Sequence, residues 1–277
     1  MKEKYKNELK IIDTQEKAYL LGFMYGDGTI STYTEINGRI RHLSRISICI
    51  DDKDMLLQLL SIFPYFNVGY FDFSKYNLNS KKQISLSKSS KELYNDLLSN
   101  GLFPRKSYEN ACKLKLPDIN QLLIPHFIRG FFDADGSVYI PTRRRNLLTM
   151  EFSSVSMELL ESLNIYLKSK NINCWKINTK HPSKGRQTCH ALVFNKTAEI
   201  QKLIDLMYKD SIIFLKRKKE KCILYKPVDK VGDRNMTCKF CGSNRVQKNG
   251  TRGDSTRFIC DDCMKGFSIK TVTFLNK

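Results

Sequence analysis

Two aspartates close two similar apolar segments, and they are the first candidates for chemistry. Asp27 ends Ala18–Gly28 and Asp135 ends His126–Gly136, in the contexts Gly-Asp-Gly and Ala-Asp-Gly. If both segments are helices, each carboxylate lies at a C-terminus that is already partly negative, which is unfavourable. A divalent cation shared by both acids relieves this repulsion, and their hard oxygen ligands suit Mg²⁺. Two acids that hold Mg²⁺ beside a basic surface favour phosphodiester hydrolysis.

A second candidate metal site comes from four of the nine cysteines. Cys238 and Cys241 form one Cys-x-x-Cys pair, and Cys260 and Cys263 form another. Two such pairs supply four thiolates from two tight turns, which is the donor set of a structural Zn²⁺ site. The odd cysteine count argues against a disulfide framework and favours plain thiols at the remaining positions. These are Cys49, Cys112, Cys174, Cys189 and Cys222.

The two apolar segments also share small residues at helical spacing. Gly22 and Gly26 lie four residues apart, and Gly130 and Ala134 match them in the second copy. Small residues at this spacing let two helix backbones approach closely, which would bring the two aspartates together. One copy alone would fit a helix that ends in an Asp-Gly turn. A matched second copy favours the paired site instead.

The same order of elements can be predicted after each segment, so the chain is expected to be an αββαββα unit repeated twice. In the first half the expected strands and helices are Thr29–Thr34, Ser44–Ile50, Asp54–Phe63, Val68–Phe73, Gln83–Ser87 and Ser90–Leu98. In the second they are Ser137–Thr142, Leu147–Val155, Ser156–Leu167, Cys174–Thr179, Thr188–Phe194 and Thr197–Tyr208. Each half then ends in an apolar pair, one further residue and an Arg-Lys pair. The lysine of this pair is Lys106 in the first half and Lys218 in the second.

These patterns predict an α+β fold with two tandem pseudo-twofold halves and a small C-terminal four-cysteine ribbon. The expected divisions are residues 1–112 for the first half, 113–224 for the second, 225–235 for a linker and 236–277 for the ribbon. Duplication within one chain completes a pseudo-dimer, so a monomer is expected.

The paired segments resemble the motif of the LAGLIDADG homing endonucleases, at Leu20–Gly28 and Ile128–Gly136, and the resemblance extends over residues 15–224. It implies that the motif helices form the interface between the halves and that the two sheets straddle the DNA major groove. Cleavage of both strands across the minor groove, leaving short 3′ overhangs, is also implied. The implied site has Asp27, Asp135, Lys106 and Lys218 as catalytic residues. The implied Mg²⁺ site comprises Asp27, Asp135, Gly26 and Ala134.

The sequence departs from the family pattern at the sixth motif position, which is Tyr25 in one copy and Asp133 in the other. We expect Asp133 to cap or pair locally rather than to bind metal. The family also has an accessory polar residue at the start of the first helix within each half. Asp51 and Ser154 are the candidates for it here.

Basic residues recur at the expected hairpin tips of both halves, as a DNA-straddling pair of sheets requires. Polar hairpin tips are common without any ligand, but few acids interrupt these ones. The candidate DNA-binding residues of the two halves are Arg39, Arg41, Arg45, Lys75, Lys81, Lys82, Arg143, Arg144, Arg145, Lys180, Lys184, Arg186 and Lys216.

The cysteine module resembles the N-terminal zinc ribbon of insertion-element transposases. The shared features are Cys-x-x-Cys-Gly-Ser, Lys-Asn-Gly at 248–250, Phe258 before the second pair and Phe267 after it. The resemblance implies a DNA-binding module held together by Zn²⁺, although a purely structural or protein-binding ribbon is the alternative. The implied DNA contacts are Arg245, Lys248, Arg252 and Arg257.

Composition and charge agree with a nucleic-acid partner. The chain of 277 residues carries 47 Lys and Arg against 28 Asp and Glu, a formal net charge of +19. Such an excess implies a polyanionic partner, with double-stranded DNA first and an anionic membrane surface second. The sequence contains no apolar run near the roughly 18 residues of a membrane span. Its polar N-terminus does not read as a secretory signal, so an intracellular location is expected, either bacterial or phage cytoplasm or an organelle.

The expected function is a Mg²⁺-dependent, site-specific homing endonuclease that cuts double-stranded DNA at a long asymmetric target. A non-cleaving nucleic-acid binder of the same fold, either an intron maturase or a transcription regulator, is the alternative, and RNA binding stays open with it. An intein-embedded nuclease is not favoured, because Met1 and the terminal Leu275–Lys277 provide no splicing residues.

Overall fold

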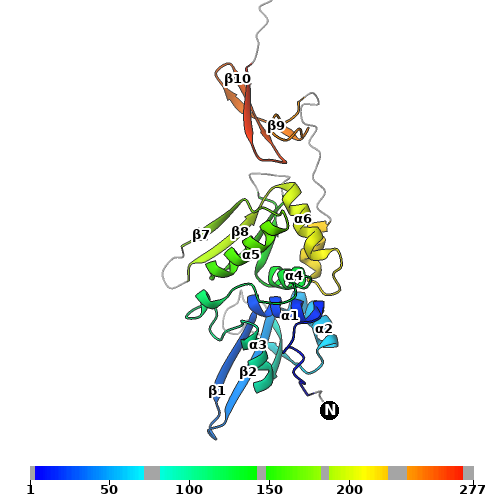
Figure 1. Ribbon diagram of the computed structural model, residues 1–277, viewed down its shortest axis with the longest axis vertical. Helices are drawn as coiled ribbons and strands as arrows, with labels where there is room; N and C mark the ends of the chain where they lie inside the picture. The colour runs from blue at the N-terminus through cyan, green and yellow to red at the C-terminus, as the bar shows by residue number, and fades with distance from the viewer. Residues whose placement is uncertain (1–3, 72–81, 142–147, 182–186, 224–235, 271–277) are drawn as a thin grey trace, which may run out of the picture.

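The chain forms two similar αβ halves and a small three-stranded sheet (Figure 1). The computed structural model describes residues 4–71, 82–141, 148–181, 187–223 and 236–270. Within these ranges the element order confirms the α+β fold with two αββαββα halves that was expected from the sequence. Two of the expected strands end at residues that lie outside the described ranges, namely 73 (with 72) and 142, and a third begins at one, 147.

Each half begins with the helix that carries its aspartate. The first half contains α1 Gln15–Gly26, β1 Gly28–Thr34, β2 Ile40–Cys49, α2 Lys53–Ile62, β3 Asn67–Phe71, β4 Gln83–Ser89 and α3 Lys91–Ser99. The second contains α4 Ile124–Asp135, β5 Gly136–Tyr139, β6 Thr149–Ser154, α5 Met157–Ser169, β7 Lys176–Lys180, β8 Cys189–Phe194, α6 Thr197–Tyr208 and α7 Lys216–Ile223.

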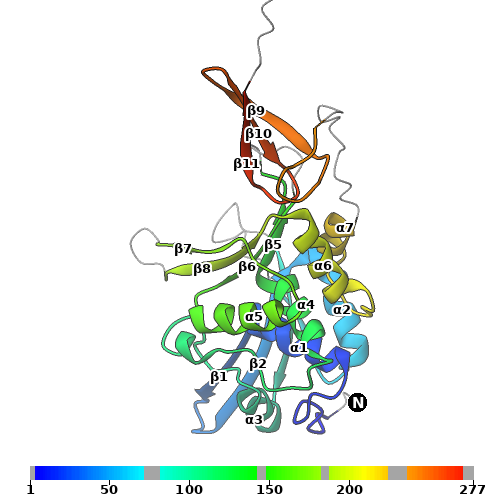
Figure 2. The same cartoon turned by 45° about the horizontal axis from the view of Figure 1, so that its top comes forward.

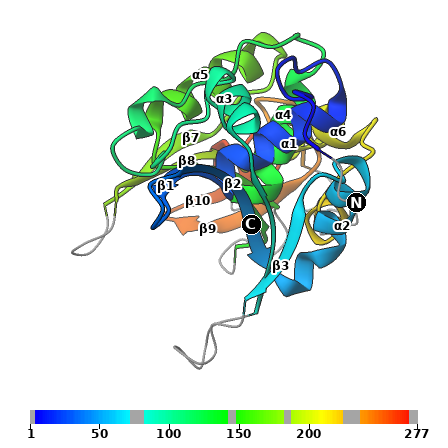
Figure 3. The ribbon, with the colours of Figure 1, turned by 90° about the horizontal axis from the view of Figure 1, so that it is seen from below.

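The two four-stranded antiparallel sheets have the same topology. Their strand orders are β1-β2-β4-β3 and β5-β6-β8-β7. The register is also the same, because Gly28 pairs with Ile46 and Gly136 pairs with Phe152, each directly after the motif aspartate. Helices α3 and α5 pack against one side of their sheets (Figure 3). The repeat in the sequence is therefore a repeat of strand pairing.

Local chemistry accounts for the start of both motif helices. The Thr14 hydroxyl accepts a hydrogen bond from the Lys17 N–H and caps α1, while Pro125 sits in the first turn of α4, where no N–H is needed. Residues 18–26 of α1 are all buried, which agrees with an apolar character all round the helix. Such a helix has to be covered on every side, and its contacts include α4 and β1.

The halves differ after their last matched helix. Lys216–Ile223 forms α7 in the second half, whereas residues 104–110 of the first half form successive turns. The matched Arg-Lys ends of the sequence therefore lie in different local structures. Strand β2 also begins four residues before the expected start, because its hairpin with β1 continues to the pair Thr34 and Ile40.

One hydrophobic core runs through both halves, and the ribbon has its own. Buried residues from α1, α4 and both sheets belong to a single cluster. The ribbon strands β9 Val246–Arg252, β10 Ser255–Cys260 and β11 Gly266–Lys270 pack around a separate small cluster. The ribbon lies at the second-half end of the molecule (Figure 2).

Candidate active site at the paired motif helices

Helices α1 and α4 lie side by side at the boundary between the halves (Figures 1 and 3), and their backbones touch. A Cβ built on Gly22 would lie 2.0 Å from the Phe127 carbonyl oxygen, and one built on Gly130 would lie 2.1 Å from the Tyr19 carbonyl oxygen. These two contacts are equivalent positions of the repeat, so the helix pair has a local pseudo-twofold axis. Only glycine fits at both positions, since a backbone atom fills the space that a side chain would need.

The C-terminal ends of the two helices meet as well. A Cβ on Gly26 would lie 2.3 Å from the Ala134 Cβ and 3.3 Å from the Asp135 Cγ. Asp27 follows directly as the C-cap of α1. The close approach that the small residues predicted therefore brings the two motif aspartates to one place.

The charge of Asp135 raises the affinity of Asp27 for protons, and both side chains remain exposed to solvent. Burial by the crowded helix ends, followed by the charge of Asp135, raises the pKa of Asp27 to about 6. Burial also raises the pKa of Asp135, which the charges of Lys106 and Lys218 oppose. Two exposed, mutually repelling oxygen donors fit a hard divalent cation such as Mg²⁺.

Lys106 lies against this acidic pair from the turn after α3. Its Nζ donates a hydrogen bond to the Gly26 carbonyl oxygen. Burial lowers the pKa of Lys106 more than the charges of Asp135 and Asp27 raise it. A cleft of about 570 Å³ adjoins this lysine between β1 and the turn that carries it.

Lys218 occupies the matching place in the second half, but its surroundings differ. Its side chain is buried on α7, and its Nζ donates to the carbonyl oxygens of Phe132, Asp133, Ala134 and Gly136 at 2.5–3.2 Å. It thereby neutralises the partly negative C-terminus of α4. Burial lowers the pKa of Lys218 to about 8.

The carbonyl groups of Gly26 and Ala134, expected in the Mg²⁺ site, are thus both in contact with lysine. Lys106 contacts the first, and Lys218 lies 3.2 Å from the second. In this arrangement the carboxylates of Asp27 and Asp135 are the exposed oxygen donors at the helix ends.

Asp133 is the sixth motif residue of α4 and points away from the acidic pair into the core. Its carboxylate accepts hydrogen bonds from the Tyr19 hydroxyl, the Tyr208 hydroxyl and the Leu215 N–H at 2.7–2.9 Å. Burial raises the pKa of Asp133 to about 6, and these hydrogen bonds oppose the rise. The expected local capping was wrong in one respect, since all three partners are remote in sequence and Tyr19 belongs to the first half.

A contact that sequence reasoning missed joins the halves beside the site. Arg217 of α7 donates to both carboxylate oxygens of Asp52 at 2.7–3.0 Å, and Asp52 precedes α2 in the first half. The positive charge of Arg217 also opposes the rise in the pKa of Asp27. The Arg-Lys pair that ends each half was the available signal for Arg217, but no pattern distinguished Asp52. The neighbouring candidates Asp51 and Ser154 accept hydrogen bonds from Cys49 and Ser156 respectively.

Comparison with known proteins agrees with this architecture. Residues 124–206 match the family model of the LAGLIDADG-like domain. The chain has the LAGLIDADG homing endonuclease fold. The family model covers α4 through most of α6, and the first half repeats the same element order and register.

Solved structures of the same kind are distant from this chain. The LAGLIDADG meganuclease I-AabMI bound to uncleaved DNA is 16% identical, with a TM-score of 0.49 over 75% of this chain and 89% of that one. The homing endonuclease I-DmoI in complex with DNA and Ca is 16% identical, with a TM-score of 0.48 over 72% and 92%. I-GzeII in complex with its DNA target is 16% identical, with a TM-score of 0.48 over 74% and 86%. No curated protein matched the sequence.

The basic residues expected to bind DNA are spread over the strands and turns of the LAGLIDADG fold. Arg39 is exposed in the β1–β2 turn, while the Arg41 Nε donates to Glu35 at 2.7 Å within the same hairpin. Arg45 lies on the face of the first sheet, 5.5 Å above the Phe71 ring. Lys82, Lys180 and Lys216 lie at ends of elements and are exposed. The remaining candidates lie outside the described residues: Lys75, Lys81, Arg143, Arg144, Arg145, Lys184 and Arg186.

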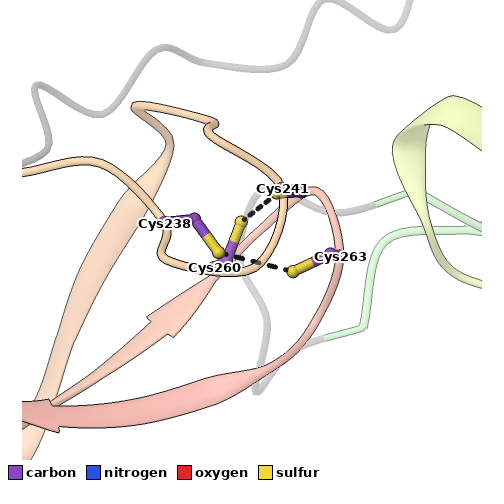
Figure 4. Close-up of side chains that lie close together, drawn as sticks. All are labelled: Cys238, Cys241, Cys260 and Cys263. Carbon is purple, nitrogen blue, oxygen red and sulfur yellow. Dashed lines mark hydrogen bonds between the residues drawn. The ribbon is translucent and has the colours of Figure 1, made fainter.

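The four ribbon cysteines converge on one point (Figure 4). The Sγ atoms of Cys238 and Cys263 are 3.6 Å apart, as are those of Cys241 and Cys260, and all four lie within 4.8 Å of one another. Four thiolates around a tetrahedral Zn²⁺ are about 3.8 Å apart, given a Zn–S distance of about 2.3 Å. This geometry fits the candidate Zn²⁺ site.

The basic residues of the ribbon divide into two kinds. Lys248, Arg252 and Arg257 are exposed on β9 and β10. The Arg245 guanidinium instead donates to the Asp262 carboxylate at 2.9 Å, beside the second cysteine pair. In the described part of the chain, no helix is long and apolar enough to cross a membrane.

Proposed function

We propose that the chain is a metal-dependent homing endonuclease that cuts both strands of double-stranded DNA at a long asymmetric site and leaves short 3′ overhangs. The observation that carries this proposal is the pair of exposed aspartates, Asp27 and Asp135, at the meeting ends of two backbone-touching helices. A pseudo-twofold pair of acids suits a duplex, whose two antiparallel strands are themselves related by twofold symmetry. The net charge of +19 supports a polyanionic substrate.

In this mechanism Asp27 and Asp135 would hold Mg²⁺ through their carboxylates. A metal bound there would supply an activated water and charge stabilisation for the leaving oxygen of the phosphodiester. Lys106, whose charge adjoins both acids, stabilises negative charge on a nearby phosphate. Lys218 holds the last turn of α4 in place through four carbonyl groups, which fixes the position of Asp135. Its ammonium reaches a phosphate only if it leaves those carbonyl groups.

The test is a cleavage assay with Mg²⁺ on a randomised duplex library, comparing the parent chain with Asp27→Asn and Asp135→Asn. Discrete double-strand cuts with short 3′ overhangs are expected for the parent. Each variant is expected to lose cutting or to nick one strand only, because each acid serves a shared centre from its own half. Cutting that either variant leaves unchanged would contradict the assignment of the acids.

A non-cleaving nucleic-acid binder is the second candidate, and one observation favours it. The carbonyl groups of Gly26 and Ala134 are both in contact with lysine ammonium groups. A binder could keep this arrangement permanently, with lysine in the place of metal. Tight DNA or RNA binding without any cutting in the same assay would support this function over the endonuclease.

We also propose that the C-terminal ribbon is a second DNA contact held together by Zn²⁺. Its exposed basic residues Lys248, Arg252 and Arg257 support this role. A tethered module of this kind raises affinity because its binding becomes intramolecular once the main body is on DNA.

A further inference from the structure

Two side chains of opposite charge occupy equivalent positions in the two halves. In the first sheet Arg45 of β2 pairs with Thr29, two residues after Asp27. In the second sheet Glu151 of β6 pairs with Ser137, two residues after Asp135. The pseudo-twofold axis that relates the motif helices therefore relates Arg45 to Glu151.

Both side chains lie on the sheet face that is turned away from the core. Their neighbours Ile46 and Phe152 are completely buried in the core, and successive side chains of a strand point to opposite faces. On the first sheet this face has a groove of about 320 Å³, to which Arg45 contributes. The family resemblance implies that the two sheets straddle the DNA major groove, and within the proposed function this is the face of both sheets that meets DNA.

Arg45 carries a guanidinium on this face. The guanidinium carbon lies 5.5 Å from the centre of the Phe71 ring. The Nε of Arg45 is buried, so hydrogen bonds to DNA have to come from the two Nη atoms. A guanidinium presented in this way can donate two parallel hydrogen bonds to one base edge.

Glu151 is unusual for a surface that faces a polyanion. It is 7% exposed, and the Tyr139 hydroxyl donates to its Oε1 at 2.6 Å. Among the described residues no lysine or arginine forms an ion pair with it. Its cross-strand neighbours Ser137 and Val193 bring no charge. A carboxylate held here repels phosphate, and a hydrogen bond accepted from a base would offset that repulsion.

The major groove limits which base can satisfy each side chain. It offers two hydrogen-bond donor groups, cytosine N4 and adenine N6, and adenine carries the N7 acceptor beside its donor. The carboxylate of Glu151 is therefore best satisfied by cytosine. Arginine donates to the paired acceptors O6 and N7 of guanine.

We propose that Arg45 reads guanine and Glu151 reads cytosine at the two target positions related by the pseudo-twofold axis. This inference rests on the proposed DNA-binding function. A twofold axis exchanges the two DNA strands, so a cytosine read at the second position places guanine on the same strand as the first. One target strand then carries guanine at both positions, where a palindrome would carry guanine and cytosine.

The experiment selects bound duplexes from a randomised library with the full-length chain, in buffer without added divalent metal and without chelator, and sequences them. The parent is compared with Glu151→Gln and Arg45→Gln. Glutamine pairs with adenine N6 and N7, so each variant is expected to change the preferred base to adenine at its own position only. A preference on the order of tenfold is expected at each position in the parent.

Glu161→Gln is the matched control, because it removes the same charge from an exposed position on α5, away from this sheet face. It is expected to select the parental sequences. Circular dichroism establishes that each variant is folded. If the parent selects a motif and Glu151→Gln leaves every position unchanged, the readout by Glu151 is wrong. A palindromic preference at the paired positions also overturns the inference. A folded parent that enriches no sequence overturns the proposed function itself.

Discussion

The pKa of Asp27, raised to about 6 by burial and by the charge of Asp135, lies close enough to neutral pH for a proton to compete with a metal ion. Above this pH the carboxylate is ionised and available as a ligand. Below it the proton must leave before metal binds, so metal affinity falls as the pH falls.

We therefore expect the Mg²⁺ concentration for half-maximal cleavage to rise about tenfold for each pH unit below about 6, and to level off above it. The measurement is a Mg²⁺ titration of the single-turnover cleavage rate between about pH 5 and about pH 8. DNA binding without metal over the same range is the control, since it separates the titration of the acids from weakened binding. A half-maximal concentration that stays constant with pH would contradict a role for the raised pKa.

Single residues also show how far the sequence alone could predict the site. Asp27 and Asp135 could be predicted to meet because their segments are copies, and the copies carry the glycines that allow close approach. The different surroundings of Lys106 and Lys218 could not be predicted, because the surroundings of Lys218 depend on α7, a helix that the first half lacks. Glu151 gave no signal in the sequence, since its importance comes from the strand register that pairs it with Arg45.

At the scale of elements, the contact between α1 and α4 is the feature that determines the geometry of the site. Most helix pairs are separated by side chains, at interaxial distances of 8–10 Å. Here the space at Gly22 and Gly130 is filled by carbonyl oxygens of the facing helix. The separation of the two acids is therefore set by backbone contact.

Gly22→Ala is expected to destabilise the protein and to reduce cleavage strongly. Alanine would normally favour a helix by about 1 kcal/mol over glycine, but its Cβ would lie 2.0 Å from the Phe127 carbonyl oxygen. The two helices must then move apart, which also moves Asp27 away from Asp135. Urea denaturation and the cleavage rate measure the two effects.

The control for that variant is Gly266→Ala in the ribbon, where the added Cβ meets its nearest described neighbour at 3.5 Å. It is expected to leave both stability and cutting nearly unchanged. A Gly22→Ala chain as stable and as active as the parent would show that the two helices are not held by backbone contact.

The elements themselves were largely predictable, and their ends were not. Apolar periodicity and the repeat identified both αββαββα halves, because each element has one buried face. The early start of β2 depends on hairpin pairing with β1, which a single segment does not reveal. The proposed division at residues 112 and 113 stays a prediction, with α4 beginning at Ile124.

At the scale of the whole molecule, the separate cores of the two-half body and the ribbon predict separate responses to loss of zinc. The ribbon core contains few residues, among them Cys238, Val246, Phe258, Cys260 and Phe267. So small a core depends on its metal for stability, whereas the joint core of the halves does not.

Removal of zinc by a chelator, or by Cys260→Ser, is expected to unfold the ribbon and leave the two halves folded. Affinity for DNA should fall, while the cleavage rate at saturating protein with Mg²⁺ restored should persist. Metal analysis is expected to find one zinc per chain, and Cys112→Ser, at an exposed cysteine outside the ribbon, should not change it. If loss of zinc leaves DNA affinity intact, the ribbon is not a DNA contact.

The backbone contact between α1 and α4 separates two properties that could otherwise change together. Under the proposed function, target choice would depend on side chains spread over two sheets, which can be exchanged one at a time. The offset between the two cuts would instead depend on the distance between two helix backbones, which is set by backbone contact. New targets would then be acquired while the length of the overhangs stays the same.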